Sequence, residues 1–273
     1  MRKMLLISTL VAGLLLAGGC GKTSGTKDGG AKKVSGVIFA QTDIQGDDNG
    51  PGTYVYPTDK VFVPGVFDLT GVTIKDGGST YDIDITIATD FKNDWTNAGG
   101  WDVQMFDVYL NLGTGNHKQT IAGRHVKIEE GWDKAILIGP DKPTRMQKEI
   151  DDKNIDVADD ISDFETLVDD ILLPDEIQTM GNTISIKISK EKLGDLSTLQ
   201  GTQVFLVGSE GYPTKTDTYN RVVNEYAAQW RIGGGSDYLG DPNVMDILGD
   251  NSKLGAYKSD EGVSEYPTVN MIK

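Results

Sequence analysis

Apolar and polar residues alternate with a period of two along much of the chain, which is the pattern of β-strands that bury one face. Residues 81–87 and 183–189 show this alternation most clearly, with their isoleucines all on one face. Residues 103–112, 135–138 and 204–207 are more continuously apolar, as central strands covered on both faces are. Turn-forming pairs such as Gly-Gly, Asn-Gly and Pro-Gly separate the runs. The pattern predicts an all-β fold, an antiparallel β-sandwich.

Three segments depart from simple alternation. Residues 159–172 place apolar side chains at steps of three and four, with acidic residues in the first turn and Pro174 after the last, which predicts one short inserted helix. Residues 219–230 contain fewer such steps and predict a second short helix. Residues 61–69 read as two short strands joined by a Pro-Gly turn.

The first 19 residues have the form of a bacterial secretory signal. Arg2 and Lys3 precede a nearly unbroken apolar run at 4–16, and small residues then lead to Cys20, the single cysteine. Because this ending resembles a lipobox, we expect Cys20 to be the lipidated amino terminus of the mature chain, anchored in a membrane. The alternatives are an uncleaved anchor, for which the apolar run is short, and a secreted protein with one free thiol.

The remainder divides into a tether and a domain. Residues 20–33 are rich in Gly, Ser, Thr and Lys and offer almost nothing apolar to pack, which predicts a flexible tether. Residues 34–273 have the length of one large all-β domain. The formal net charge of the chain is −15, which argues against nucleic acid as a partner and against electrostatic binding to anionic lipid.

An acidic turn near the start of the domain predicts a calcium site. Three oxygen-bearing side chains stand between two glycines in this turn, and two more aspartates flank it along the chain. The five candidate ligands are Asp43, Asp47, Asp48, Asn49 and Asp68. Carboxylate and amide oxygens suit calcium, although the spacing is not that of an EF-hand. The alternative is that these residues cap turns by accepting backbone N–H bonds. A second acidic turn at 237–246 is a further candidate for the same edge of the fold.

The tryptophans predict a carbohydrate site. Sugar rings stack on flat aromatic faces, while their hydroxyls need amide and carboxylate partners. One loop supplies both kinds of group, in Asn93, Asp94, Trp95, Asn97 and Trp101. We expect Trp95 and Trp101 to be exposed side by side, and Trp132 and Trp230, which lead into predicted strands, to lie in the core. The alternative for every tryptophan is a place in the core of the sandwich.

Four stretches in this order carry a resemblance to a known family. Residues 46–71 read GDDNGPGTYVYPTDKVFVPGVFDLTG, followed by NDW and GWDVQ within 93–104, GWDKA at 131–135, and WRIGGG with DPNVMD within 230–246. Over residues 36–270 the chain resembles the glucodextranase C-terminal-like family. The resemblance implies a β-sandwich similar to a carbohydrate-binding module, with a binding role and no established catalytic machinery.

The residues themselves give little support for an enzyme. No serine lies in a nucleophile elbow, and the only histidines, His117 and His125, stand in a loop where no third zinc ligand follows at a recognisable spacing. We expect both histidines to be exposed to solvent. Two carboxylates suffice for glycoside hydrolysis, but a chain with 41 acidic residues brings such pairs together by chance.

Together these observations predict a non-catalytic surface lipoprotein that binds α-glucan or another polysaccharide or oligosaccharide at the cell envelope. Two alternatives remain. One is a structural or protein-binding component of the envelope, and the other is an accessory protein for oligosaccharide uptake.

Overall fold

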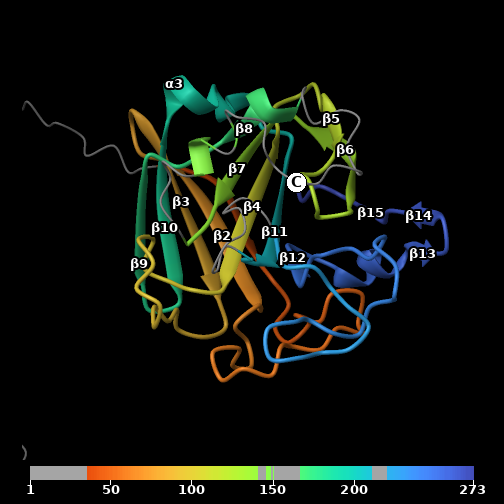
Figure 1. Cartoon of the computed structure of the whole chain (residues 1–273). Helices are drawn as coiled ribbons and strands as arrows, with labels where there is room; N and C mark the ends of the chain where they lie inside the picture. The colour runs from red at the N-terminus through yellow and green to blue at the C-terminus, as the bar shows by residue number, and fades with distance from the viewer. Residues whose placement is uncertain (1–35, 141–145, 149, 151–166, 211–219) are drawn as a thin grey trace, which may run out of the picture. The chain divides into compact units, whose positions relative to one another are not determined.

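Among the residues that the structure describes, two five-stranded sheets enclose the main apolar core (Figure 1). The computed structural model describes residues 36–140, 146–148, 150, 167–210 and 220–273. The first sheet is antiparallel throughout, in the order β1 (Val37–Thr42), β2 (Leu69–Asp76), β3 (Thr80–Ile87), β10 (Thr183–Ser189) and β9 (Glu176–Met180). The second has the order β12 (Asp246–Ile247), β11 (Gly201–Gly208), β4 (Gln104–Asn111), β7 (Lys134–Ile138) and β8 (Ile171–Leu172), with β8 parallel to β7.

The first sheet buries one face, as its alternating sequence predicts. Buried and half-exposed residues alternate along the whole of β3, and the isoleucines of β3 and β10 pair across the strands, Ile83 with Ile186 and Ile85 with Ile184. On the outer face Asp84 accepts hydrogen bonds from Lys75 and Ser185. The predicted alternation at 81–87 and 183–189 is therefore confirmed.

The second sheet is buried on both faces. Every residue of β4 and β11 is buried, which confirms the prediction made from their continuous apolar runs. One face of β4 points into the core between the sheets, and the other, with Met105 and Tyr109, packs in a second apolar cluster that contains Trp132. This second cluster is covered in part by a three-stranded sheet of β5 (His117–Gln119), β6 (Lys127–Trp132) and β15 (Thr268–Val269).

The remaining described elements are short. They are the helix α3 (Lys190–Leu193), the 3₁₀ helices η1 (Val168–Asp170), η2 (Leu196–Thr198) and η3 (Asn251–Gly255), and the hairpin of β13 (Lys258–Asp260) and β14 (Val263–Glu265). No helix of the described part of the chain is long and apolar enough to cross a membrane.

The predictions for the three irregular segments need correction. Most of the helix predicted at 159–172 lies outside the described residues; within them Leu167 is helical and η1 follows it, and only Ile171 and Leu172 depart from the prediction by forming β8. Within 219–230 the described residues form isolated β-bridges rather than a helix, because their backbone groups bond to neighbouring chain segments. Residues 61–68 form successive turns rather than two strands, and these turns bury both Phe62 and Phe67. The signal sequence, Cys20 and the tether also lie outside the described residues.

Candidate functional site

Two segments far apart in sequence lie side by side where β2 begins, residues 43–68 and residues 220–246 (Figure 1, orange and light blue). Val55 and Gly233 exchange two backbone hydrogen bonds of 2.9 Å, and Gly50 N–H donates to the carbonyl of Met245 at 2.8 Å. Gly234 has a φ of +88°, and a Cβ atom there would clash with the Thr53 carbonyl. The close approach of the two segments therefore explains the need for glycine at this position.

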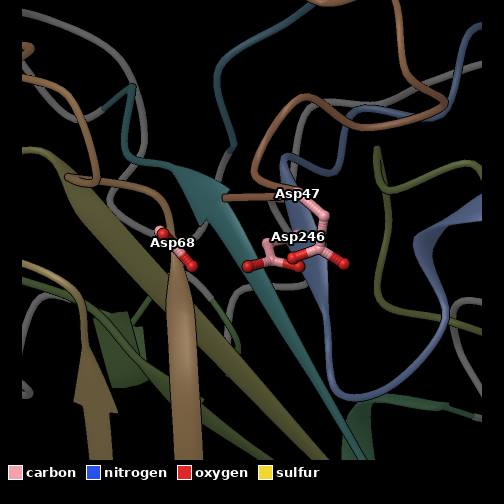
Figure 2. Close-up of side chains that lie close together, drawn as sticks. All are labelled: Asp47, Asp68 and Asp246. Atoms are coloured by element: carbon pink, nitrogen blue, oxygen red, sulfur yellow. The ribbon is translucent and has the colours of Figure 1, made fainter. Parts of the chain in front are cut away.

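Three carboxylates converge between these segments. Asp47 lies in the turn after β1, Asp68 immediately before β2, and Asp246 at the start of β12 (Figure 2). One oxygen of each lies within 4.8 Å of one oxygen of each of the others. We call these three residues the acidic cluster.

Backbone N–H groups fix one oxygen of two of these carboxylates. Asp68 Oδ2 accepts the Gly46 N–H at 2.8 Å, and Asp246 Oδ2 accepts the Leu69 N–H at 2.7 Å. Asp246 Oδ1 accepts from the Asn251 amide at 2.9 Å. Three other buried oxygens have no hydrogen-bond partner, namely Asp47 Oδ1, Asp68 Oδ1 and Oδ2 of the nearby Asp43. Capping of turns therefore accounts for only part of this arrangement.

The electrostatics of the cluster are unfavourable without a positive charge. Burial, with the negative charges of Asp43 and Asp47 adding to it, raises the pKa of Asp246 to about 9. Burial likewise raises the pKa of Asp43 to about 7 and that of Asp68 to about 6. At an effective dielectric constant of 20, two ionised carboxylates about 5 Å apart repel by about 3 kcal/mol. Among the described residues, no Lys, Arg or His forms an ion pair with the three carboxylates of the cluster or with Asp43.

The structure brings together only part of the predicted ligand set. Asp47 and Asp68 meet in the cluster, and Asp43 lies close enough to raise the pKa of Asp246. Asp48 instead accepts a hydrogen bond from the Tyr56 hydroxyl. Asn49 organises the turn, since its carbonyl accepts from the N–H groups of the two residues Gly52 and Tyr54. The remaining member, Asp246, comes from the second acidic turn, and no local signal in the sequence shows that it reaches Asp68.

The predicted carbohydrate loop is rearranged in the structure. Trp101 has no exposed surface, and its indole N–H donates to the Gln104 carbonyl at 2.7 Å. The expectation that Trp101 is an exposed ring is wrong, because the loop turns at Gly100 and places the indole against Phe91. The side chains of Asn93 and Asn97 bond to the loop itself, and Asp94 is exposed.

Trp230 occupies the surface position expected of Trp101. It is 40% exposed, although its place before a predicted strand indicated a core residue. Its ring lies 5.7 Å from that of the half-buried Trp95, at an angle of 58°. Phe62 contacts Trp230 edge-on at 6.1 Å between ring centroids. Beside this segment, the amide of Gln229 donates to Asp59 at 2.9 Å. We call Trp95 and Trp230 the tryptophan pair.

The histidines are not exposed loop residues, contrary to expectation. His117 is half-buried and bonds to the Asp170 carboxylate at 2.7 Å, with its ring against Trp132. His125 is buried and bonds through Nδ1 to the Asp241 carbonyl at 2.8 Å. Each imidazole therefore has its own structural partner.

Comparison with protein families identifies the chain. Residues 38–266 match the model of the C-terminal, SLH-like binding module of glucodextranase. The chain belongs to this family. The resemblance noted in the sequence is thereby confirmed, as is the β-sandwich fold. The family is a binding module rather than a catalytic domain. A comparison with curated proteins finds no match.

Proposed function

We propose that the protein is a non-catalytic lipoprotein of the cell envelope that binds a polysaccharide or oligosaccharide through the tryptophan pair. The observation that carries this proposal is the pairing of two partly exposed indoles, Trp95 and Trp230, on a module of a binding family. Two tilted aromatic faces suit successive sugar rings, whose C–H faces are apolar.

Polar groups suited to sugar hydroxyls lie along the same two segments. Asn93 and Asp94 are exposed next to Trp95, and Asn97 is half-buried in the same loop. Gln229, the residue before Trp230, donates its side-chain amide to Asp59. A site that combines an apolar face with a few amide and carboxylate groups has the usual composition of a carbohydrate site.

The envelope location rests on the family and on the first 20 residues. The family is SLH-like, which favours association with the cell envelope. The signal sequence at 1–19 supplies the route of export, and Cys20 supplies the site of the lipid anchor.

Retention on immobilised glycans tests the binding function. The mature chain, with Cys20→Ser to keep it free of lipid, is screened against α-glucans and other polysaccharides, and then compared with Trp230→Ala. We expect retention of the parent chain and its loss in Trp230→Ala.

A second surface provides the matched control. A groove of about 430 Å³ lies at the opposite end of β2 and β3, where Lys190 stands over the ring of Tyr81 and pairs with Asp76. Lys190→Ala should bind glycan as the parent does. Loss of retention in Lys190→Ala but not in Trp230→Ala would move the site to this groove. Absence of binding to every glycan would favour a structural or protein-binding role in the envelope.

A further inference from the structure

We infer that the acidic cluster binds a divalent cation of the size of calcium, which links the segment at 43–68 to strand β12. The convergence of Asp47, Asp68 and Asp246 alone does not establish a site, because acidic residues gather on many surfaces that bind no metal. A second observation is the environment of Asp68. The residue is only 5% exposed, yet its Oδ1 has no hydrogen-bond partner while Oδ2 is held by Gly46.

The carboxylates of the acidic cluster lie close to one another. Figure 2 shows one oxygen of Asp68 directed towards the carboxylate of Asp246, with the carboxylate of Asp47 on the other side of Asp246. Asp47 Oδ1 is also buried without a partner, and so is Oδ2 of Asp43 beside the cluster. A buried carboxylate oxygen without a donor is unfavourable unless a cation takes the donor's place. One ion would satisfy several of these oxygens at once.

The donor set selects the class of metal. The candidate ligands are carboxylates without nitrogen or sulfur, and such hard oxygen ligands favour calcium or magnesium over zinc. The oxygens lie within 4.8 Å of one another. Calcium–oxygen bonds of about 2.3 to 2.6 Å place opposite ligands about 4.6 to 5.2 Å apart, so three such oxygens fit around one calcium ion. Calcium also accepts the irregular geometry that ligands from three separate elements provide.

The consequence for the fold is a cross-link between distant parts of the chain. Backbone bonds already connect Asp68 to Gly46 and Asp246 to Leu69. A bound ion adds a contact that exists only in the folded state, so it raises the unfolding temperature as its occupancy increases.

Asp68→Asn is the most specific test, because it replaces a single carboxylate oxygen and keeps the size of the side chain. The amide oxygen can keep the bond from Gly46 N–H, while the NH₂ group replaces the unpartnered Oδ1 and removes a negative charge. The mature chain with Cys20→Ser is freed of metal with EDTA, and Ca²⁺ or Mg²⁺ is then titrated by calorimetry and by thermal unfolding.

We expect the parent chain to bind one Ca²⁺ saturably and to unfold several degrees higher in millimolar calcium than in EDTA, with a smaller effect of magnesium. Asp68→Asn should lose at least tenfold in calcium affinity. In EDTA it should unfold at or above the temperature of the parent chain, because it relieves repulsion. Asp90→Asn, which changes an exposed aspartate after the end of β3, should behave as the parent does.

Three results would overturn the inference. The first is that calcium gives neither a heat of binding nor a thermal shift. The second is an unchanged calcium affinity in Asp68→Asn, and the third is tighter binding of magnesium than of calcium. If Asp68→Asn fails to fold, Asp47→Asn in the half-buried turn makes the same comparison.

Discussion

The ring centroids of Trp95 and Trp230 lie 5.7 Å apart, although the two residues are 135 positions apart in the sequence. The contact joins the loop before β4 to the segment that runs beside residues 43–68. Each indole therefore helps to position the other, and a ligand that stacks on one ring depends on the placement of both.

This relationship predicts coupled effects on glycan binding. By analogy with base–aromatic stacking, replacing either tryptophan by alanine should cost about 1 to 3 kcal/mol of binding free energy. This loss corresponds to about a five- to hundredfold decrease in affinity. Because the rings are in contact, Trp95→Ala and Trp230→Ala together should cost less than the sum of the two. Calorimetric titration with the glycan identified by screening measures all three variants. Tyr238→Ala, another exposed aromatic, is the control, and strictly additive losses would show that the rings act independently.

The two misassigned tryptophans predict losses of stability of different size. Trp101 is fully buried and bonded to Gln104, so Trp101→Ala should lower the free energy of unfolding by about 3 to 5 kcal/mol. Trp230 keeps 40% of its surface exposed, and Trp230→Ala should cost about 1 to 2 kcal/mol. Urea unfolding of both variants measures the difference. Equal losses would contradict the surface role given to Trp230.

Local pattern was sufficient for the sheets but not for the sites. The alternation at 183–189 specifies β10 because one face of a strand must be buried whatever its neighbours are. The exposure of an indole, by contrast, depends on distant partners, Phe91 for Trp101 and Trp95 for Trp230. Asp246 comes close to Asp68 because its carboxylate accepts the backbone N–H of Leu69, which is 177 positions away, and no local signal encodes this contact.

A buried ion pair should contribute strongly to stability. Arg124 donates from Nε to Asp107 at 2.7 Å and from Nη2 at 2.9 Å, and neither side chain has exposed surface. Removing one partner leaves an uncompensated buried charge, so Asp107→Ala should lower the free energy of unfolding by about 3 to 5 kcal/mol. Asp84→Ala breaks the partly exposed pair with Lys75 and should cost at most about 1 kcal/mol. Chemical denaturation measures the free energy of unfolding of both variants. If Asp107→Ala loses no more stability than Asp84→Ala, the prediction is wrong.

Attachment to the membrane and processing of the signal should depend on Cys20. Cys20→Ser removes the thiol that would carry the lipid, so the protein should leave the membrane fraction or remain unprocessed. Fractionation of cells followed by mass determination of the amino terminus measures both outcomes. Ser24, in the predicted tether, gives the matched control in Ser24→Ala. A processed Cys20→Ser chain that still sediments with membranes would show another means of attachment.

Asp133 should make stability depend on pH in the acid range. It is 5% exposed and accepts backbone N–H bonds from Leu112 at 2.7 Å, Asn116 at 3.1 Å and Thr114 at 3.2 Å. Burial acts to raise the pKa of this carboxyl, but these bonds and one from Gly115 outweigh it and hold the pKa below 3.8.

Because the folded-state pKa of Asp133 is lowered, its stabilisation is present in full above the unfolded pKa of about 4 and is lost as the pH falls through the folded value. Asp133→Asn should therefore lower the free energy of unfolding at pH 7, by about 2 kcal/mol for weakened bonds to a charged acceptor. The difference from the parent chain should shrink as the pH falls below about 4, towards the lowered pKa of the folded state. Urea unfolding at a series of pH values from 7 downwards measures the free energy of unfolding of both chains, and Asp90→Asn, which changes an exposed aspartate, is the control. A difference that stays constant down to about pH 2 would mean that the charge of Asp133 contributes nothing to the stability of the loop.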